Sequence, residues 1–293
     1  MSIDLDPRFK TIIKTVENYC LDYEDPSVAD KYAYLYPEGY DAFGLEEEQV
    51  LALRDVVLKN IQFNVEETAE LAWRLFATGK YEYGSVAILL LKHVQQEFNR
   101  AVFDFVRRIF DSGVENWVHA DALCTDIIPV FLEKKIVTMD DFIPWRMAKS
   151  KWTRRAVPVS MLALVATKEP QELLDFIDPM MRDEAKVVQE GLGLLLREIW
   201  KLHPQNVDSF LQQHKQHCAS QIIQTATEKM SSEQKNRYNK DKNHKKNFKN
   251  PRKPERKPVQ QEKKVTKSSG DMYRGKEMLT PKPKAPHPNK VKS

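Results

Sequence analysis

The sequence has few of the residues that build disulfide-rich, metal-binding or β-rich folds. Its three cysteines, Cys20, Cys124 and Cys218, are widely separated and form no Cys-x-x-Cys pair, which argues against a zinc knuckle or a disulfide framework. Glycine is sparse, and alternation of β-branched residues is scarce. The longest apolar runs, residues 86–91 and 161–166, are far below the ~20 residues that a membrane span needs. With no secretory signal evident, we expect an intracellular protein with buried free thiols and neither membrane nor metal.

Negative charge outweighs positive charge in most of the chain, and positive charge predominates only at the carboxyl end. Residues 231–293 hold 20 Lys and Arg against 6 Asp and Glu, a net charge of +14. Residues 1–230 carry a net −10, so the overall +4 combines an acidic body with a basic tail. The tail also has seven prolines and few apolar residues, which is typical of a disordered segment. Its charge favours DNA tethering, although a solubilising or localisation role fits the same composition.

Helix signals fill the first 230 residues. Apolar residues recur three and four positions apart, as at Leu173, Phe176 and Ile177, and Asn64 is an N-cap followed by acidic residues. The expected helices, with bounds good to about 2–4 residues, cover residues 7–23, 27–36, 46–60, 65–78, 83–94, 101–111, 117–133, 139–150, 152–167, 171–182, 185–202, 207–214 and 219–230.

From residue 65 onward the expected helices form pairs with short connectors. Each pair takes roughly 35–40 residues, which is the spacing of HEAT and armadillo repeats. Such pairs stack into a solenoid whose concave face is a ready binding surface. The sequence therefore predicts an all-α, HEAT-like α-solenoid domain over residues 1–230, followed by a disordered basic tail over residues 231–293.

Residues 142–155 carry a net positive charge, in contrast to the acidic body around them. This stretch has five basic side chains and no acid, with Trp145 and Trp152 between them. Because a forked guanidinium suits phosphate oxygens, the stretch is a candidate phosphate-binding surface. A solvated helix face with two core tryptophans would give the same pattern. The basic residues are Arg146, Lys149, Lys151, Arg154 and Arg155.

A second stretch, Asn-Trp-Val-His-Ala-Asp at residues 116–121, places Trp117 four residues before Asp121. On a helix this spacing sets an indole and a carboxylate side by side on one face, which suits a flat, positively charged, sugar-linked ligand. A helix-surface carboxylate and a core tryptophan would fit the same spacing. We expect His119 to line a groove or the surface, and Cys124, one turn beyond Asp121, to lie in the core.

Together these stretches resemble the DNA alkylation-repair glycosylases of the AlkD type, over about residues 42–215. The most specific part is the combination of Trp-x-x-x-Asp at 117–121 with Trp-x-x-Arg at 152–155, each of which is weak alone. The resemblance implies a HEAT-like solenoid that binds double-stranded DNA with alkylated bases as a monomer, without cofactor or metal and without a tight base pocket. Further matching residues are Phe43-Gly44, Ile128-Pro129, Leu196-Arg197-Glu198 and His203-Pro204.

The resemblance also implies roles for individual residues. The catalytic carboxylate falls on Asp121, the sugar-facing indole on Trp117 and the phosphate-gripping guanidinium on Arg155. Two positions depart from the family, because Leu194 stands where a second lesion-side tryptophan is expected and Glu46 where a polar residue is frequent. The residues expected to extend the DNA contact are Arg154, Trp152, Lys151 and Lys149.

The chemistry implied by the resemblance needs few groups. An N3- or N7-alkylated purine already carries a positive charge and leaves as a neutral base, so no general acid is required. A single carboxylate can then stabilise the sugar cation and orient water, and an indole adds ~1–2 kcal/mol of cation–π support. The resemblance therefore implies an alkylpurine DNA glycosylase that acts by hydrolysis in base excision repair. It also implies a location in the cytoplasm, associated with the nucleoid, or in the nucleus if the source is a eukaryote.

Two other functions remain open from the sequence. Leu194 is compatible with a non-catalytic paralogue of the same fold that binds damaged or branched DNA. The acidic body is compatible with a HEAT-type protein scaffold without a role on DNA.

Overall fold

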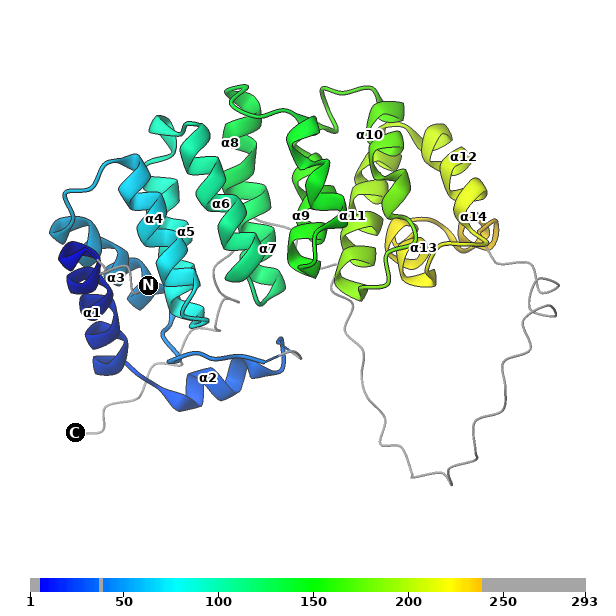
Figure 1. Cartoon of the computed structure of the whole chain (residues 1–293). Coiled ribbons are helices and arrows are strands. Elements are labelled where there is room, and N and C mark those ends of the chain that lie inside the picture. Colours follow the sequence, from blue (N-terminus) through cyan, green and yellow to red (C-terminus); the bar gives the residue numbers. More distant parts are fainter. Residues whose placement is uncertain (1–5, 37–38, 239–293) are drawn as a thin grey trace, which may run out of the picture. The chain divides into compact units, whose positions relative to one another are not determined.

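The computed structural model describes residues 6–36 and 39–238, and within these ranges the chain is helical without a β-strand (Figure 1). The described residues divide into two compact units, one ending at Ala156 and one beginning at Val157. No helix in these ranges is both long and apolar enough to cross a membrane. The predicted disorder of the tail from residue 239 onward lies outside the described residues.

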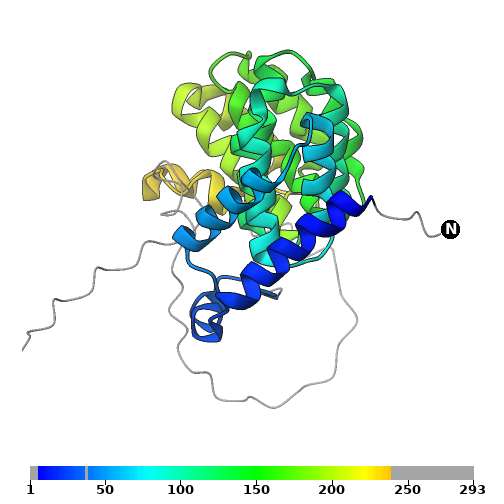
Figure 2. The same ribbon diagram turned by 90° about the vertical axis from the view of Figure 1, so that its left-hand side faces the viewer.

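The first unit stacks helices in two layers. Helix α4 packs against α6 in one layer, and α5 packs against α3 and α7 in the other, with α4 and α5 paired across the layers. Helix α1 packs on α3, and Figure 2 looks onto α1 from this end of the unit. The elements are α1 (Pro7–Asp22), α2 (Pro26–Ala33), α3 (Glu47–Asn60), α4 (Val65–Phe76), α5 (Tyr81–His93), η1 (Gln95–Glu97), α6 (Arg100–Ser112), α7 (Trp117–Ala122), the π-helical turn η2 (Leu123–Ile127), α8 (Ile128–Glu133), η3 (Met139–Phe142), η4 (Pro144–Met147) and the start of α9 (Lys151–Ser160).

The second unit repeats this two-layer arrangement. Helix α11 packs against α13 in one layer and α10 packs against α12 in the other, while α11 and α12 pair across them. The fold is therefore all-helical with HEAT-like helical pairs, as the sequence predicts. The elements after α9 are η5 (Met161–Leu164), α10 (Pro170–Ile177), η6 (Asp178–Met180), α11 (Lys186–Leu202), α12 (Pro204–His214), α13 (Ser220–Ala226) and α14 (Ser232–Asn236).

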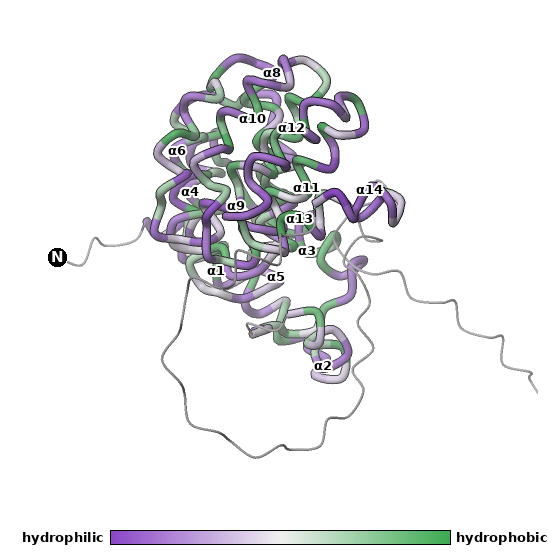
Figure 3. Tube along the Cα trace, turned by 90° about the vertical axis from the view of Figure 1, so that its right-hand side faces the viewer, coloured by the Kyte–Doolittle hydropathy of each residue, from purple (hydrophilic) through white to green (hydrophobic). Residues whose placement is uncertain are grey.

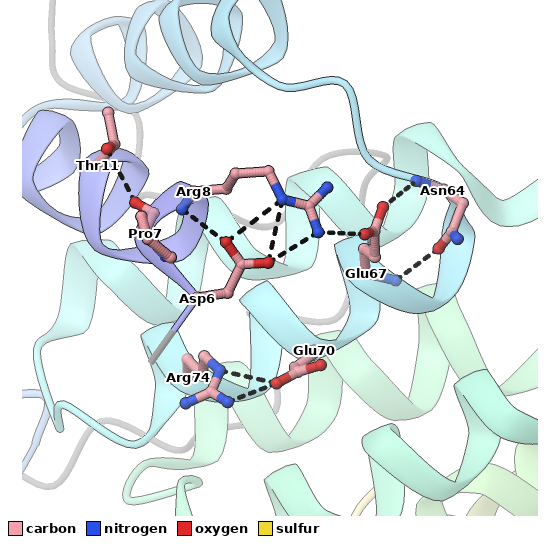
Figure 4. A network of polar contacts seen from close by, with 8 residues as sticks. All are labelled: Asp6, Pro7, Arg8, Thr11, Asn64, Glu67, Glu70 and Arg74. Atoms are coloured by element: carbon pink, nitrogen blue, oxygen red, sulfur yellow. Dashed lines mark hydrogen bonds and ion pairs between the residues drawn. The ribbon is translucent and has the colours of Figure 1, made fainter. Parts of the chain in front are cut away.

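An exposed polar network joins the start of α1 to the start of α4 (Figure 4). The guanidinium of Arg8 donates to Asp6, the N-cap of α1, and reaches Glu67 at 2.6 Å. Glu67 also accepts the backbone N–H of Asn64, which caps α4 in return. Each helix start is thus satisfied by its own cap, and Arg8 links the two caps.

Phe43-Gly44, one of the stretches that carry the resemblance, forms a backbone turn around a buried carboxylate. Glu82 is 1% exposed and accepts the N–H groups of Phe43, Gly44 and Leu45 at 3.0, 2.8 and 3.2 Å. Gly44 has φ +87°, and a Cβ there would lie 2.1 Å from the carbonyl oxygen of Asp25. Glycine is required for both reasons, so this motif positions the start of α3.

Prolines account for two helices that differ from the sequence prediction. The expected helix 117–133 contains the π-helical turn η2, which ends two residues before Pro129. Proline lacks an N–H and would clash in a regular α-helix. The expected helix 139–150 is instead two 3-10 turns, η3 and η4, separated at Pro144.

Helix α14 lies in the segment that composition predicts to be disordered. Ser231 and Gln234 cap it reciprocally, with Ser231 Oγ accepting from Gln234 N at 3.2 Å and Gln234 Oε1 accepting from Ser231 N at 2.9 Å. The helix is hydrophilic along its length (Figure 3), which is why it gave no apolar period to detect. The predicted boundary at residue 230 therefore precedes a short ordered segment.

Candidate active site

Helix α7 begins at the candidate motif and is fixed at its first turn. Asn116 caps the helix, because its Oδ1 accepts the backbone N–H of His119 at 2.9 Å. The indole of Trp117 is half-buried, and its Nε1–H donates to the carbonyl of Leu35 at 3.3 Å. The segment after α2 therefore holds the indole in one orientation.

Asp121, one turn after Trp117, is paired with Arg155 of α9. The guanidinium donates from Nε to Oδ1 at 2.8 Å and from Nη2 to Oδ2 at 2.7 Å, a bidentate arrangement. Asp121 is 1% exposed and Arg155 is 3% exposed. The structure thus brings the predicted carboxylate and guanidinium together, but in the interior of the first unit. Neither side chain is open to a ligand in this conformation, and their roles toward DNA stay predictions.

The sequence of α9 explains why Arg155 points at α7. Thr153 Oγ1 donates to the carbonyl of Phe110 at 3.0 Å and anchors α9 on the end of α6. The small Ala156 is fully buried, and its carbonyl lies 3.8 Å from the Sγ of Cys124 on η2. This close approach leaves the intervening Arg155 facing Asp121. Burial of Cys124 in the core is as predicted.

The basic stretch at 142–155 divides into core and surface residues. Trp145 and Trp152 are 2% and 6% exposed, so both indoles are core side chains, and the expectation that Trp152 contacts DNA directly is wrong for this conformation. Arg154 donates to the carbonyls of Ala148 and Lys149 at 2.8 and 3.1 Å, which stabilises the loop before α9.

Two lysines of the predicted DNA contact remain at the surface. Lys149 is exposed, and Lys151 is partly exposed with its Nζ 5.3 Å from the centre of the Trp152 ring. These two cations can still meet a phosphate backbone.

His119 is buried, and the expectation that it lines a groove or the surface is wrong. Its ring fits in the interior because the facing residue on α5 is a glycine. Its imidazole is 3% exposed and lies against Gly84 of α5, where a Cβ would come within 2.6 Å of the ring. Tyr81 stacks on the imidazole with centroids 4.6 Å apart. Only a glycine at position 84 permits α7 to approach α5 this closely.

The hydrogen bonds of His119 exclude a general-base role toward Ser85. The amide Nδ2 of Asn116 can only donate, and it lies 3.0 Å from Nδ1 of His119, so Nδ1 accepts. Nε2 is then the protonated nitrogen and donates to Ser85 Oγ at 3.0 Å. A base that accepts the serine proton would need the opposite tautomer. These contacts fix α7 on α5 and do not form a nucleophilic site.

Burial lowers the pKa of His119 from 6.5 to about 3, which predicts a pH-dependent stability. Above about 6.5 the imidazole is neutral in both folded and unfolded chains, and its packing contributes fully. As the pH falls from 6.5 toward 3, only the unfolded chain takes up the proton, so stability is lost at up to ~1.4 kcal/mol per pH unit. Urea unfolding across this range should show a shallower pH slope for His119→Gln than for the unaltered chain.

The control for this prediction is His93→Gln, since His93 is exposed at the end of α5. This variant should keep the slope of the unaltered chain. An unchanged slope in His119→Gln would contradict the prediction.

Sequence reasoning missed Tyr81 and Glu82, because the expected helix began at residue 83, directly after them. The available signal was Gly84-Ser85 inside an otherwise bulky helix, since adjacent small residues there mark a close approach of another element. In the described part of the chain, His, Cys, Asp and Glu side chains do not gather in groups of three that could hold a metal ion.

Comparison with known proteins places this chain in a family. The family described as DNA alkylation repair enzyme matches residues 21–230. The chain belongs to this family. The match contains the whole Asn116–Asp121 stretch and all of α9, and the family supports a role on DNA in alkylation repair. No curated protein matches the chain.

One solved structure supports the helical fold. A predicted DNA alkylation repair enzyme from Enterococcus faecalis aligns with a TM-score of 0.55 and 19% identity, covering 71% of this chain and 97% of its own. The smu.31 protein of Streptococcus mutans aligns with a TM-score of 0.43 and 17% identity, covering 77% of this chain and 98% of its own. At such identities the first likeness shows the fold alone.

Leu194 of α11, at the position of the missing second tryptophan, is 4% exposed and belongs to the core of the second unit. An aliphatic side chain packed among core residues offers no ring for stacking on a base or sugar.

Proposed function

We propose that this protein is a DNA glycosylase that hydrolyses the N-glycosidic bond of positively charged N3- and N7-alkylpurines. The observation that carries the proposal is the placement of Trp117, Asp121 and Arg155, in which an indole, a carboxylate and a guanidinium come from two adjacent helices. The family match supplies the substrate class, alkylated DNA.

The reaction needs one carboxylate and one water. The water oxygen bonds to C1′ while the C1′–N bond breaks, and its electron pair goes to the ring nitrogen of the base. The cationic base leaves neutral, and the positive charge departs as the proton released by water. Asp121 stabilises the cationic sugar and orients the water, while the Trp117 ring faces the same charge.

Arg155 must change partner before Asp121 can act. Its Nε and Nη2 now hold both carboxylate oxygens, and the pair is nearly inaccessible. A DNA phosphate suits the same fork of N–H donors as a carboxylate does. Arrival of the backbone can therefore move the guanidinium to phosphate and release Asp121 toward the sugar, which couples DNA binding to exposure of the catalytic group.

The test is release of N7-methylguanine and N3-methyladenine from methylated duplex DNA, followed by chromatography of the free bases. We expect time-dependent release with stoichiometric abasic sites left in the duplex. Intact DNA after incubation with folded protein would reject the glycosylase activity.

A second candidate is a non-catalytic protein that binds damaged or branched DNA. The near-complete burial of Asp121 and the aliphatic Leu194 favour it. In that case the duplex is retained, no base is released, and retention is unaffected by Asp121→Asn.

A further inference from the structure

The first turn of α5 fastens the end of the segment that precedes α3. The backbone N–H of Tyr81 donates to the carbonyl of Asp41 at 2.8 Å, and Nζ of Lys80 pairs with the Asp41 carboxylate at 2.5 Å. The carboxylate of Glu82 accepts the backbone N–H groups of residues 43–45 just beyond. The end of this segment is therefore fixed relative to α5.

Three tyrosine rings, the tyrosine cluster of Tyr36, Tyr40 and Tyr81, join the same segment to α7. Tyr36 is 8% exposed, and its ring lies parallel to that of Tyr40 with centroids 4.4 Å apart. It also makes a T-shaped contact with the ring of Tyr81 at 5.4 Å. Tyr81 in turn stacks on His119 of α7 at 4.6 Å.

The tyrosine cluster keeps these contacts near neutral pH. Burial raises the pKa of Tyr36, and a hydrogen bond from its hydroxyl to Tyr81 adds to the rise. Burial raises the pKa of Tyr81 to about 12. Both phenols are therefore neutral, and no buried phenolate disturbs the stack.

The tyrosine cluster adjoins the acceptor of the Trp117 indole. Leu35, directly before Tyr36, is the residue whose carbonyl accepts Nε1–H of Trp117 at 3.3 Å. An indole has a single N–H donor, and this bond is the one polar contact of the Trp117 side chain among the described residues. The position of Leu35 therefore decides which way the ring faces.

We infer that Tyr36 and Tyr81 are positioning residues for Trp117: they hold the Leu35 carbonyl in place, and through it they present the face of the indole to the reacting sugar. The inference rests on the proposed function, in which this ring faces the developing positive charge. A ring turned away from the sugar loses cation–π stabilisation mainly in the transition state, where the sugar charge is largest. Disturbing the cluster should therefore slow the chemical step more than it weakens DNA binding.

The kinetic test is single-turnover release of N7-methylguanine from methylated duplex DNA by the full chain at several protein concentrations. Tyr36→Leu should lower the maximal rate about tenfold, while the protein concentration at half-maximal rate changes by less than about twofold. Tyr36→Phe keeps the ring and should stay within about threefold of the unaltered chain. In a Trp117→Phe background, which has no indole N–H to orient, Tyr36→Leu should have little further effect.

The indole N–H resonance of Trp117 gives a second readout, which does not depend on base release. In a proton–nitrogen correlation spectrum it is the indole signal that is lost in Trp117→Phe. We expect Tyr36→Leu to shift or broaden this signal, because the hydrogen bond to Leu35 is weakened. If Tyr36→Leu does not fold, Tyr40→Leu carries the same test, since it removes the ring on which Tyr36 stacks.

Two variants serve as controls for the resonance. Tyr36→Phe retains the stacked ring, and Phe63→Leu removes a half-buried ring that pairs with Phe9 at 5.0 Å, outside the tyrosine cluster. Both should leave the Trp117 signal near its original position.

An unchanged Trp117 signal in both leucine variants of the cluster would overturn the inference. So would a rate loss from Tyr36→Leu that is as large in the Trp117→Phe background as in the unaltered chain, because the effect would then not pass through the indole. A shifted signal in a protein whose unaltered chain releases no base would instead reject the glycosylase proposal and leave the positioning of Trp117 in place.

Discussion

Replacing Asp121 by Asn is expected to reduce the release of N7-methylguanine from methylated duplex DNA at least about a hundredfold. An amide keeps the shape of the side chain but removes the negative charge that the proposed mechanism sets against the developing sugar cation. Loss of one such electrostatic group costs about 10²–10³ in rate in other enzymes. Single-turnover release of base from the duplex measures the effect, because it reports the chemical step without product dissociation.

The matched control for this variant is Asp126→Asn, five residues further along the same helical segment. Asp126 pairs with Lys92 at 2.9 Å and is partly exposed. This change should leave base release near that of the unaltered chain. A rate for Asp121→Asn within about threefold of the control would remove Asp121 from the mechanism.

The second large effect is on stability. Replacing Asp121 by Leu removes the carboxylate that pairs with the buried guanidinium of Arg155, and removal of one partner of a buried ion pair costs about 3–5 kcal/mol. Urea unfolding should show this loss. The double variant Asp121→Leu, Arg155→Met should recover most of it, because two apolar side chains of similar size leave no unpaired charge.

An exposed pair provides the comparison. Lys14 and Glu17 are 2.8 Å apart on α1 with both side chains largely exposed, so Glu17→Gln should leave the unfolding curve unchanged. If the double variant of Asp121 and Arg155 were as unstable as the single one, the loss would come from packing rather than from charge. Since Asp121→Asn also weakens the pair, its activity should be measured where circular dichroism shows it folded.

Most of the helices could be predicted because their signals are local. The caps at Asp6 and Asn64 and the apolar period of α10 each depend only on neighbouring residues. The π-helical turn before Pro129 was harder to predict from the sequence, because a proline can end, kink or widen a helix and tertiary packing selects among these outcomes. Helix α14 was missed because a polar helix has no periodic pattern.

The candidate site was harder to predict than the helices. Spacing alone set Trp117 and Asp121 one turn apart, but only the packing of α9 on α7 shows that Arg155 engages Asp121. Local sequence does not encode which partner a charged side chain chooses among distant residues, and the buried position of His119 depends likewise on a glycine 35 positions away.

The glycine at position 84 also constrains how this site can change over time. Any larger residue there would push the imidazole outward and with it the helix that bears Trp117 and Asp121. A larger residue at position 84, whether natural or engineered, would therefore require a smaller side chain at position 119. The position of α7, and with it the geometry of the candidate site, therefore depends on the absence of a side chain at position 84 of α5.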